Sequence, residues 1–267
     1  MAQTSPIQVN GFGGIFLKVE DPKYLARWYE DNLGIGFGNN LYFSFKWRDA
    51  IQSESICRTD FCFFGMKSEY FSPSMRNIML NIRVDDLDKA LEYLKGKNVE
   101  VFEKTEAHQY GKFGWAMDPE GNKLELWQPI EAGFGDLCKK SALRGFVTGI
   151  GGVFIKSKDP KNLASWYKEH FNLPFQGPYC VIGWKDENNK EAEGSTVFSF
   201  FKEDTDYFNP SRSEFMINFR VNDLEKALSE LRSNQVEVME KSEDYDYGKF
   251  GWFVDPVGNK VELWQPK

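Results

Sequence analysis

Residues 110–129, YGKFGWAMDPEGNKLELWQP, decide the fold because they return almost unchanged later in the chain. Residues 247–266 read YGKFGWFVDPVGNKVELWQP, and sixteen of the twenty positions are identical at an offset of 137. In both copies an Asp-Pro-x-Gly-Asn segment between two apolar runs is typical of the tight turn of a β-hairpin. Repetition at this spacing indicates that the chain duplicates a unit of about 125 residues.

A second matching pair lies upstream in each unit. Residues 11–29, GFGGIFLKVEDPKYLARWY, match residues 149–167, GIGGVFIKSKDPKNLASWY, at twelve of nineteen positions. Each segment reads as a strand, then Asp-Pro, then a helix, with Asp21 and Asp159 as N-cap candidates and Gly34 as a C-cap candidate. We therefore predict domains at 7–130 and 146–267, joined by a linker at 131–145.

A weaker repeat divides each unit again. The strand-like run MLNIRV, which starts at Met79, also precedes a helical segment, LDKALEYLKGKNV. Two or three further strand-like runs follow each helix, and in the first half they cover 41–48, 60–66, 100–104, 110–117 and 123–127. This repeated order of segments therefore predicts an α+β fold of four βαβββ modules, two in each half.

Alternation along the strands divides the side chains between two faces. One face is aliphatic and is expected to pack on the helices. The other carries Glu125 and Glu262, our candidate catalytic residues, and twelve candidate ligand-binding residues. These are Phe16, Lys18, Met79, Asn81, Arg83 and Trp127 in the first half and Phe154, Lys156, Met216, Asn218, Arg220 and Trp264 in the second. This face is either solvated or the wall of a polar cavity, and Glu125 can also form a structural ion pair with Lys18 or Arg83, which is compatible with a cavity wall.

Composition narrows the classes of function. The net charge of −7 and the pI of about 5.1 disfavour nucleic acid as a partner. No apolar run approaches the roughly 20 residues that span a bilayer, so no membrane partner is expected. The first residues lack the basic and apolar regions of a secretory signal, which predicts a cytoplasmic location. Aromatic residues make up 16% of the chain and predict large cores or aromatic-lined cavities.

Histidine and cysteine offer little chemistry. The chain has only two histidines, and we expect His108 at the surface and His170 as a cation at a helix end. The cysteines lack CxxC spacing and are expected to be free thiols: Cys57, Cys62, Cys138 and Cys180. A histidine-based metal centre or catalytic triad is therefore disfavoured.

Four such modules, with DPxGNxxELW near the end of each half, resemble the vicinal oxygen chelate superfamily. That group includes glyoxalase I, bleomycin-resistance proteins and extradiol dioxygenases. The resemblance covers nearly the whole chain apart from the linker. It implies two glyoxalase-like domains whose mixed sheets form cups with the helices outside, and cups of this family often hold a divalent metal through His and Glu. It also implies that the halves pack as an internal pseudo-dimer, while a further homodimer stays open.

The metal-binding pattern of the family is mostly missing from this sequence. The residues at its histidine positions are Gly14 and Met79 in the first half and Gly152 and Met216 in the second. The strand segments 60–64 and 196–200 offer no obvious inward carboxylate, which leaves Glu125 and Glu262. One carboxylate does not make a selective transition-metal site, so we predict neither a metal nor a cofactor.

Three functions follow from these observations. The favoured one is a metal-free protein that binds a small, partly aromatic or anionic molecule, as in the bleomycin-resistance branch. The alternative is a lyase, isomerase or dioxygenase that uses Glu125 or Glu262 as a general base or a residual metal ligand. The third is a structural or assembly protein whose cups are filled by its own side chains.

Overall fold

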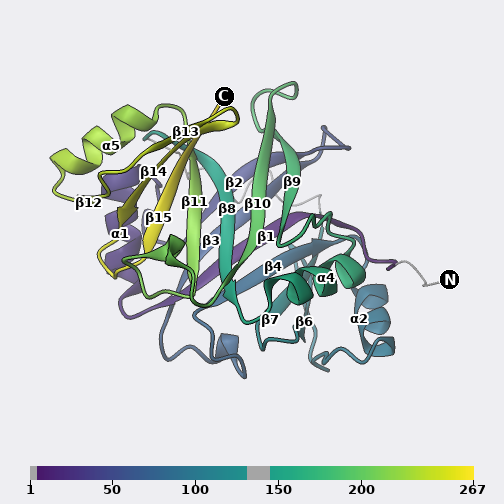
Figure 1. Cartoon of the computed structure of the whole chain (residues 1–267). Coiled ribbons are helices and arrows are strands. Elements are labelled where there is room, and N and C mark those ends of the chain that lie inside the picture. Colours follow the sequence, from purple (N-terminus) through teal and green to yellow (C-terminus); the bar gives the residue numbers. More distant parts are fainter. Residues whose placement is uncertain (1–4, 131–144) are drawn as a thin grey trace.

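The computed structural model describes residues 5–130 and 145–267 and has the predicted α+β fold (Figure 1). The first half consists of β1 (Val9–Val19), α1 (Pro22–Leu33), β2 (Tyr42–Asp49), β3 (Ile56–Gly65), the 3-10 helix η1 (Glu69–Phe71), β4 (Ile78–Val84), α2 (Leu87–Gly96), β5 (Glu106–His108), β6 (Gly111–Met117) and β7 (Lys123–Pro129).

The second half repeats this order from β8 onward. It consists of β8 (Val147–Ser157), α4 (Pro160–Phe171), β9 (Tyr179–Asp186), β10 (Glu193–Lys202), the 3-10 helix η3 (Asp206–Phe208), β11 (Phe215–Val221), α5 (Leu224–Ser233), β12 (Glu237–Val238), β13 (Glu243–Tyr245), β14 (Gly248–Val254) and β15 (Lys260–Pro266). The predicted linker lies almost entirely outside the described residues, as does Cys138, and the proposed domain boundaries stay a prediction.

The described strands form one continuous sheet in the order β12-β14-β15-β11-β8-β10-β9-β2-β3-β1-β4-β7-β6-β5, with β13 paired to β14. In each half the first strand lies between a parallel and an antiparallel neighbour: β1 between β3 and β4, and β8 between β10 and β11. The half-sheets join through the antiparallel pair β2 and β9. This mixed pairing brings β1, β3, β4 and β7 side by side, and their polar faces form the candidate site.

Local sequence signals set the helix ends. The Asp21 carboxylate accepts hydrogen bonds from the backbone N–H groups of Lys23 and Tyr24 at the start of α1. Asp159 does the same for Asn162 at the start of α4. Gly34 ends α1 in the left-handed region at φ 67°, where a glycine avoids the Cβ strain of other residues. The predicted caps are therefore confirmed.

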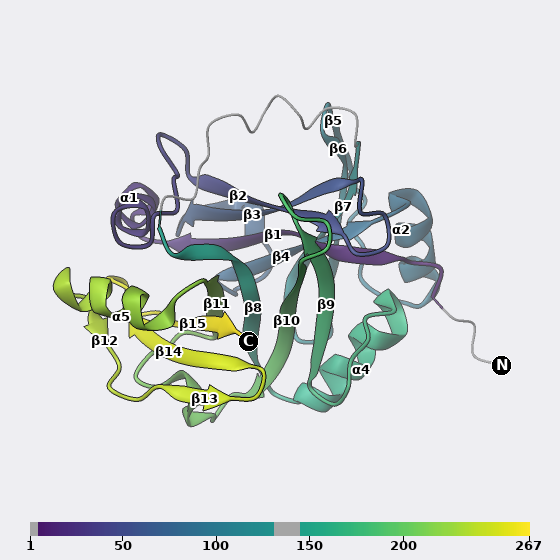
Figure 2. The same cartoon turned by 90° about the horizontal axis from the view of Figure 1, so that it is seen from above.

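The aliphatic faces of both half-sheets contribute to one core cluster shared with the four helices. Phe12 and Phe198 meet edge-to-face with ring centres 5.3 Å apart, and Trp28 on α1 packs 6.0 Å from Phe253. Figure 2 shows α1 beside α5 at one side of the molecule and α2 beside α4 at the other. The first module of each half therefore packs with the second module of the other half.

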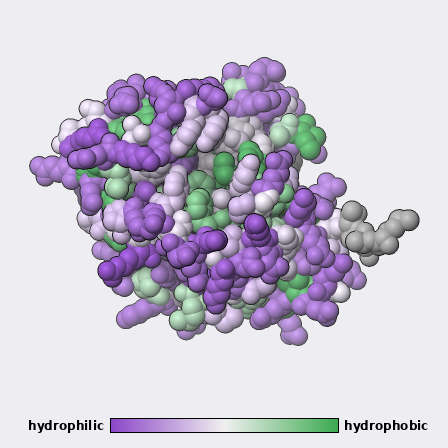
Figure 3. Space-filling model, in the orientation of Figure 1, coloured by the Kyte–Doolittle hydropathy of each residue, from purple (hydrophilic) through white to green (hydrophobic). Residues whose placement is uncertain are grey.

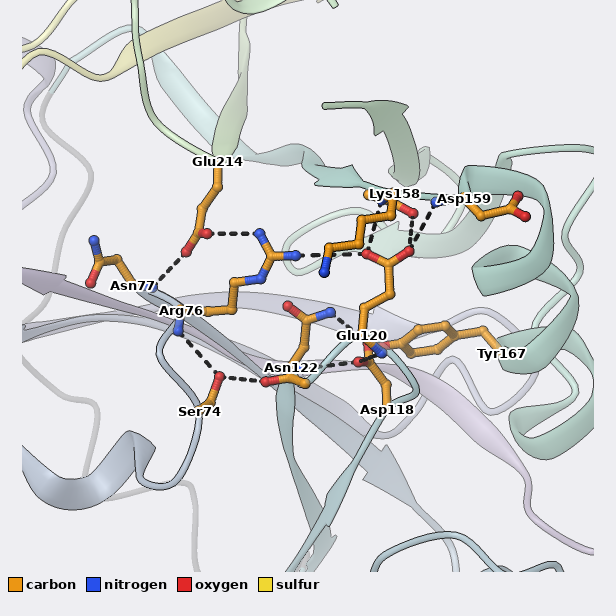
Figure 4. A network of polar contacts seen from close by, with 12 residues as sticks. Ser74, Arg76, Asn77, Asp118, Glu120, Asn122, Lys158, Asp159, Tyr167 and Glu214 are labelled. Carbon is orange, nitrogen blue, oxygen red and sulfur yellow. Dashed lines mark hydrogen bonds and ion pairs between the residues drawn. The ribbon is translucent and has the colours of Figure 1, made fainter. Parts of the chain in front are cut away.

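A polar network also joins the halves (Figure 4). The Glu120 carboxylate accepts hydrogen bonds from the Ser157 hydroxyl at 2.6 Å and from the backbone N–H groups of Lys158 and Asp159, both at 3.1 Å. Arg76 lies between two carboxylates, at 2.8 Å from Glu214 and 3.6 Å from Glu120. The turn after β6 in the first half thereby stabilises the start of α4 in the second.

Two local expectations differ from the structure. The predicted strand at 100–104 reduces to a single bridge between Val101 and Ala116, with backbone hydrogen bonds between β6 and both Glu100 and Phe102 on either side of it. His170 is not a helix-end cation. It is buried against Trp166, and burial lowers the pKa of its imidazole.

The outer surface shown in Figure 3 is mostly hydrophilic, with small groups of apolar residues. Within the two described ranges, no helix is both long enough and apolar enough to cross a membrane.

Candidate functional site

The polar face of the first half-sheet lines a cavity of about 330 Å³, called the first cavity below. This volume is at the lower end of the range of about 300–1,000 Å³ found for small-molecule sites. Half of its lining residues are aromatic, with several polar groups among the rings. The lining residues are Gly13, Phe16, Tyr42, Arg58, Asp60, Cys62, Phe64, Tyr70, Asn81, Gln109, Tyr110, Phe113, Glu125 and Trp127.

Glu125 on β7 is held at the inner end of this cavity. One of its oxygens accepts a hydrogen bond from the Asn81 amide at 2.6 Å. The other accepts from the Trp115 indole N–H at 2.9 Å and from the Tyr70 hydroxyl. The register places Asn81 opposite Glu125 on the neighbouring parallel strand, so pairing of β4 with β7 builds the contact.

Burial dominates the electrostatics of this carboxyl. Glu125 is only 2% exposed, and burial raises its pKa, while hydrogen bonds from Tyr70 and Asn81 oppose the rise. Burial and the Glu125 carboxylate together raise the pKa of the Tyr70 hydroxyl well above its ordinary range. Tyr70 therefore stays a neutral hydrogen-bond donor to Glu125.

A second polar group of the first cavity is an ion pair on β3. The Arg58 Nε atom lies 3.3 Å from Asp60 Oδ2, and the side chains are 15% and 19% exposed. The Ser44 hydroxyl donates to the other oxygen of Asp60. Burial raises the pKa of Asp60, and the Arg58 charge opposes this rise. The expectation that strand segment 60–64 offers no inward carboxylate is therefore wrong for the first half.

The twelve ligand-binding candidates fall into different places. Phe16, Asn81 and Trp127 line the first cavity together with Glu125. Met79 is buried in the aromatic cluster behind the cavity. Lys18 lies over the Phe71 ring, with its Nζ 4.9 Å from the ring centre, away from the first cavity. Whether the lining residues bind a ligand stays a prediction.

The ion pairs suggested for Glu125 are not the contacts that the structure shows. Arg83 is 2% exposed and stands between the rings of Trp47 and Trp127, at 5.6 and 5.1 Å from their centres. Its guanidinium donates to the Asn10 side chain and to the Cys57 sulfur. Uncharged donors hold Glu125 instead, and they come from β4, β6 and the 3-10 helix η1.

The second half repeats the inner end of the site. Glu262 accepts hydrogen bonds from the Asn218 amide, the Trp252 indole at 2.7 Å and the Tyr207 hydroxyl. Burial raises the pKa of Glu262, as it does for Glu125. The remaining second-half candidates occupy corresponding places: Phe154 and Met216 in an aromatic cluster, Lys156 over Phe208, and Arg220 between Trp184 and Trp264.

The strand that carries Arg58 and Asp60 in the first half, β3, differs from its counterpart β10 in the second half. Trp47 donates to Thr59 and Trp184 donates to Thr196 at the same 3.0 Å, which fixes the alignment of β3 with β10. Ser195 then stands at the place of Arg58 and Val197 at the place of Asp60. The charged pair therefore belongs to the first half alone.

Sequence reasoning missed three residues that build the first cavity. Tyr70 lies in the short 3-10 helix η1 and packs flat on Phe64, with ring centres 5.4 Å apart and planes 2° from parallel. Trp115 lies on the hairpin strand β6, and its indole reaches Glu125. Tyr110, the first residue of the repeated stretch 110–129, also lines the cavity. Their repetition as Tyr207, Trp252 and Tyr247 was the one available signal.

The residues here do not fit a transition-metal centre. Both Glu125 oxygens accept hydrogen bonds from neutral donors, and the Arg58 cation beside Asp60 would repel a metal cation there. The neighbouring strand positions carry Gly14 and Met79, which offer no nitrogen or carboxylate ligand. Within residues 5–130 and 145–267, no group of three or more His, Cys, Asp or Glu residues is arranged to hold a metal ion.

Solved structures with a similar fold are glyoxalases and dioxygenases. The Mn(II)-bound glyoxalase from Novosphingobium aromaticivorans superposes with a TM-score of 0.63 at 12% identity, covering 97% of this chain and 83% of that one. The 2,3-dioxygenase LapB from Pseudomonas sp. KL28 gives 0.62 at 13% identity, covering 99% and 93%. The 2,2',3-trihydroxybiphenyl 1,2-dioxygenase from Sphingomonas wittichii strain RW1 gives 0.55 at 12% identity, covering 96% and 90%.

These likenesses show that the chain has the fold of the glyoxalases and extradiol dioxygenases, as the sequence resemblance implied. At such low identity they show the fold alone. No family model and no curated protein matches the chain.

Proposed function

We propose that this protein is a tandem glyoxalase-fold protein that binds a small, partly aromatic molecule in the first cavity without a bound metal. The observation that carries the proposal is the aromatic-walled cavity of about 330 Å³ in which Arg58, Asp60, Asn81 and Glu125 converge. Apolar walls with a few placed polar groups are the usual design of a small-molecule site. The halves would act as an internal pseudo-dimer, consistent with their shared core.

A thermal-shift screen of mono- and bicyclic aromatic compounds, followed by calorimetry, tests this proposal. Removing the Tyr110 ring in Tyr110→Ala should weaken binding by roughly 3- to 10-fold, the value of one aromatic contact. Tyr247→Ala is the matched control, because Tyr247 is the corresponding residue of the second half and 63% exposed.

Filling the cavity provides a second test. Cys62 is partly buried in the wall, and Cys62→Phe should abolish binding by occupying the ligand volume. Melting curves and circular dichroism establish that each variant is folded. Binding that survives both Cys62→Phe and Tyr110→Ala, or a screen without any hit, would contradict the proposal.

The second candidate is a lyase or isomerase with Glu125 as general base. It is favoured by one observation, a cavity-lining carboxyl whose pKa is raised by burial, which suits proton abstraction near neutral pH. The three donors that hold Glu125 favour the binding role, because they reduce its basicity. Turnover of any screened ligand that disappears in Glu125→Gln would favour the enzyme.

A further inference from the structure

The Arg58–Asp60 pair stands in the cavity wall because of strand alternation. Residues 58, 60, 62 and 64 of β3 share the face that lines the first cavity, whereas Phe61 and Phe63 face the core. The guanidinium carbon of Arg58 also lies 5.4 Å from the centre of the Trp127 ring. The two charges are therefore held within the wall that a bound molecule would touch.

The second half forms the corresponding strand without such a pair. Removing two charges from water has a desolvation cost that their attraction often fails to offset. The second half forms the same strand with Ser195 and Val197 at these places, and keeps the Trp184–Thr196 hydrogen bond that matches Trp47–Thr59. A costly feature that the duplicate omits without changing the strand is better explained by ligand recognition than by stability.

The chemistry of the pair defines what it can recognise. A guanidinium carries five N–H groups and a carboxylate about four lone-pair positions, so a pair of this kind can also donate to and accept from a third group. Its net charge is zero. A ligand anion would meet the Asp60 carboxylate, and a ligand cation would meet Arg58. A neutral edge with an acceptor beside a donor matches the pair best.

The surrounding rings define the rest of the ligand. Phe16, Phe64, Tyr110 and Phe113 line the same cavity, and flat aromatic groups pack best on such walls. We infer that the Arg58–Asp60 pair is the specificity-determining element of the first cavity, and that the ligand is a neutral planar ring system with a lactam-like edge. This inference rests on the proposed function.

Four probes of one ring size test the inference by calorimetry. They are 2-quinolone, N-methyl-2-quinolone, which lacks the donor, quinoline-2-carboxylate, an anion, and N-methylquinolinium, a cation. Wild-type protein should bind 2-quinolone at least about 10-fold more tightly than the other three, because only it satisfies both members of the pair. Equal or tighter binding of the anion, the cation or the methylated probe would overturn the inference.

Two double variants then locate the preference. Arg58→Ser with Asp60→Val copies the second half, and Arg58→Met with Asp60→Leu keeps similar side-chain sizes without the hydrogen-bonding groups. Both should bind 2-quinolone and N-methyl-2-quinolone equally, within about two-fold, through the aromatic walls. Ser195→Ala in the second half is the control and should keep the wild-type preference.

The outcomes of these experiments distinguish failure of this inference from failure of the proposed function. Probes that bind wild type without a preference, or a preference that persists in either folded double variant, overturn the inference and leave the proposed function standing. Unfolding of the serine–valine variant also overturns it, because the pair would then be needed for the fold. If none of the four probes binds, and the wider aromatic screen also fails, the proposed function itself is contradicted.

Discussion

The two halves share the arrangement around the buried glutamates Glu125 and Glu262. They differ at the strand that carries Arg58 and Asp60 in the first half, and at the contact between the halves. Glu125 and Glu262 have equivalent partners, so duplication preserved the buried carboxylate as a unit. The wall differs by the charged pair Arg58–Asp60, which the second half lacks. The arrangement around the glutamates is therefore common to both halves, and the charged pair distinguishes the first.

The turns that follow β6 and β14 extend the comparison to the interface. In both, the turn aspartate accepts a hydrogen bond from a tyrosine on the first helix of the other half: Asp118 from Tyr167 at 3.0 Å and Asp255 from Tyr29 at 3.1 Å. Two positions further on, the turns differ, because Glu120 is replaced by Val257. One side of the interface is therefore closed by ionic and hydrogen-bonding contacts that the other side lacks.

The largest expected effect is at this asymmetric position. Glu120→Val should lower the free energy of unfolding by about 2–4 kcal/mol, because the Ser157 hydroxyl and two backbone N–H groups lose their acceptor and Arg76 loses one of two carboxylates. Val257→Ala, at the matching place, should cost less than about 1 kcal/mol, since Val257 is 41% exposed. Urea unfolding measures both, and equal losses would contradict the asymmetry.

The next effect should be equal on the two sides. Tyr167→Phe and Tyr29→Phe should each lower the free energy of unfolding by about 1–2 kcal/mol, because each removes one buried hydrogen bond to a turn aspartate. Thermal and urea unfolding of both variants and of the double variant checks this. A loss confined to one tyrosine would show that the interface is less symmetric than its hydrogen bonds.

The smallest effect concerns pH. Burial raises the pKa of Glu125 and of Glu262, so the folded state favours their protonated forms. The contribution of each glutamate to the free energy of unfolding is fully present below the pKa of an unfolded glutamate. It is lost as the pH rises through the pKa of that glutamate in the folded protein. Relative to Glu125→Gln or Glu262→Gln, wild type should therefore lose stability with rising pH across that window.

Urea unfolding at a series of pH values measures this difference for both variants. The two curves should run parallel, since the partners of the carboxyls correspond. A difference that grows in favour of wild type with rising pH would mean that the hydrogen bonds outweigh burial.

Much of the fold could be predicted because its signals are local or repeated. Caps at Asp21 and Gly34 depend on a few neighbouring residues, and alternation alone assigned Phe16, Asn81, Glu125 and Trp127 to one face. The site was predicted less completely. Tyr70 and Glu125 are 55 residues apart in the sequence. No periodic pattern of residues along the chain indicates a contact between two residues so far apart.

The sequence by itself determined the duplication, the α+β class, the helix ends and the faces of the strands, because these depend on identity between repeats and on short-range steric and hydrogen-bonding preferences. Only the tertiary structure decided that Glu125 is held by Tyr70, Asn81 and Trp115, and that Asp60 lines the cavity beside Arg58. It also decided that each turn aspartate stabilises the other half. Such contacts depend on how strands and loops from distant parts of the chain pack together, which no local pattern encodes.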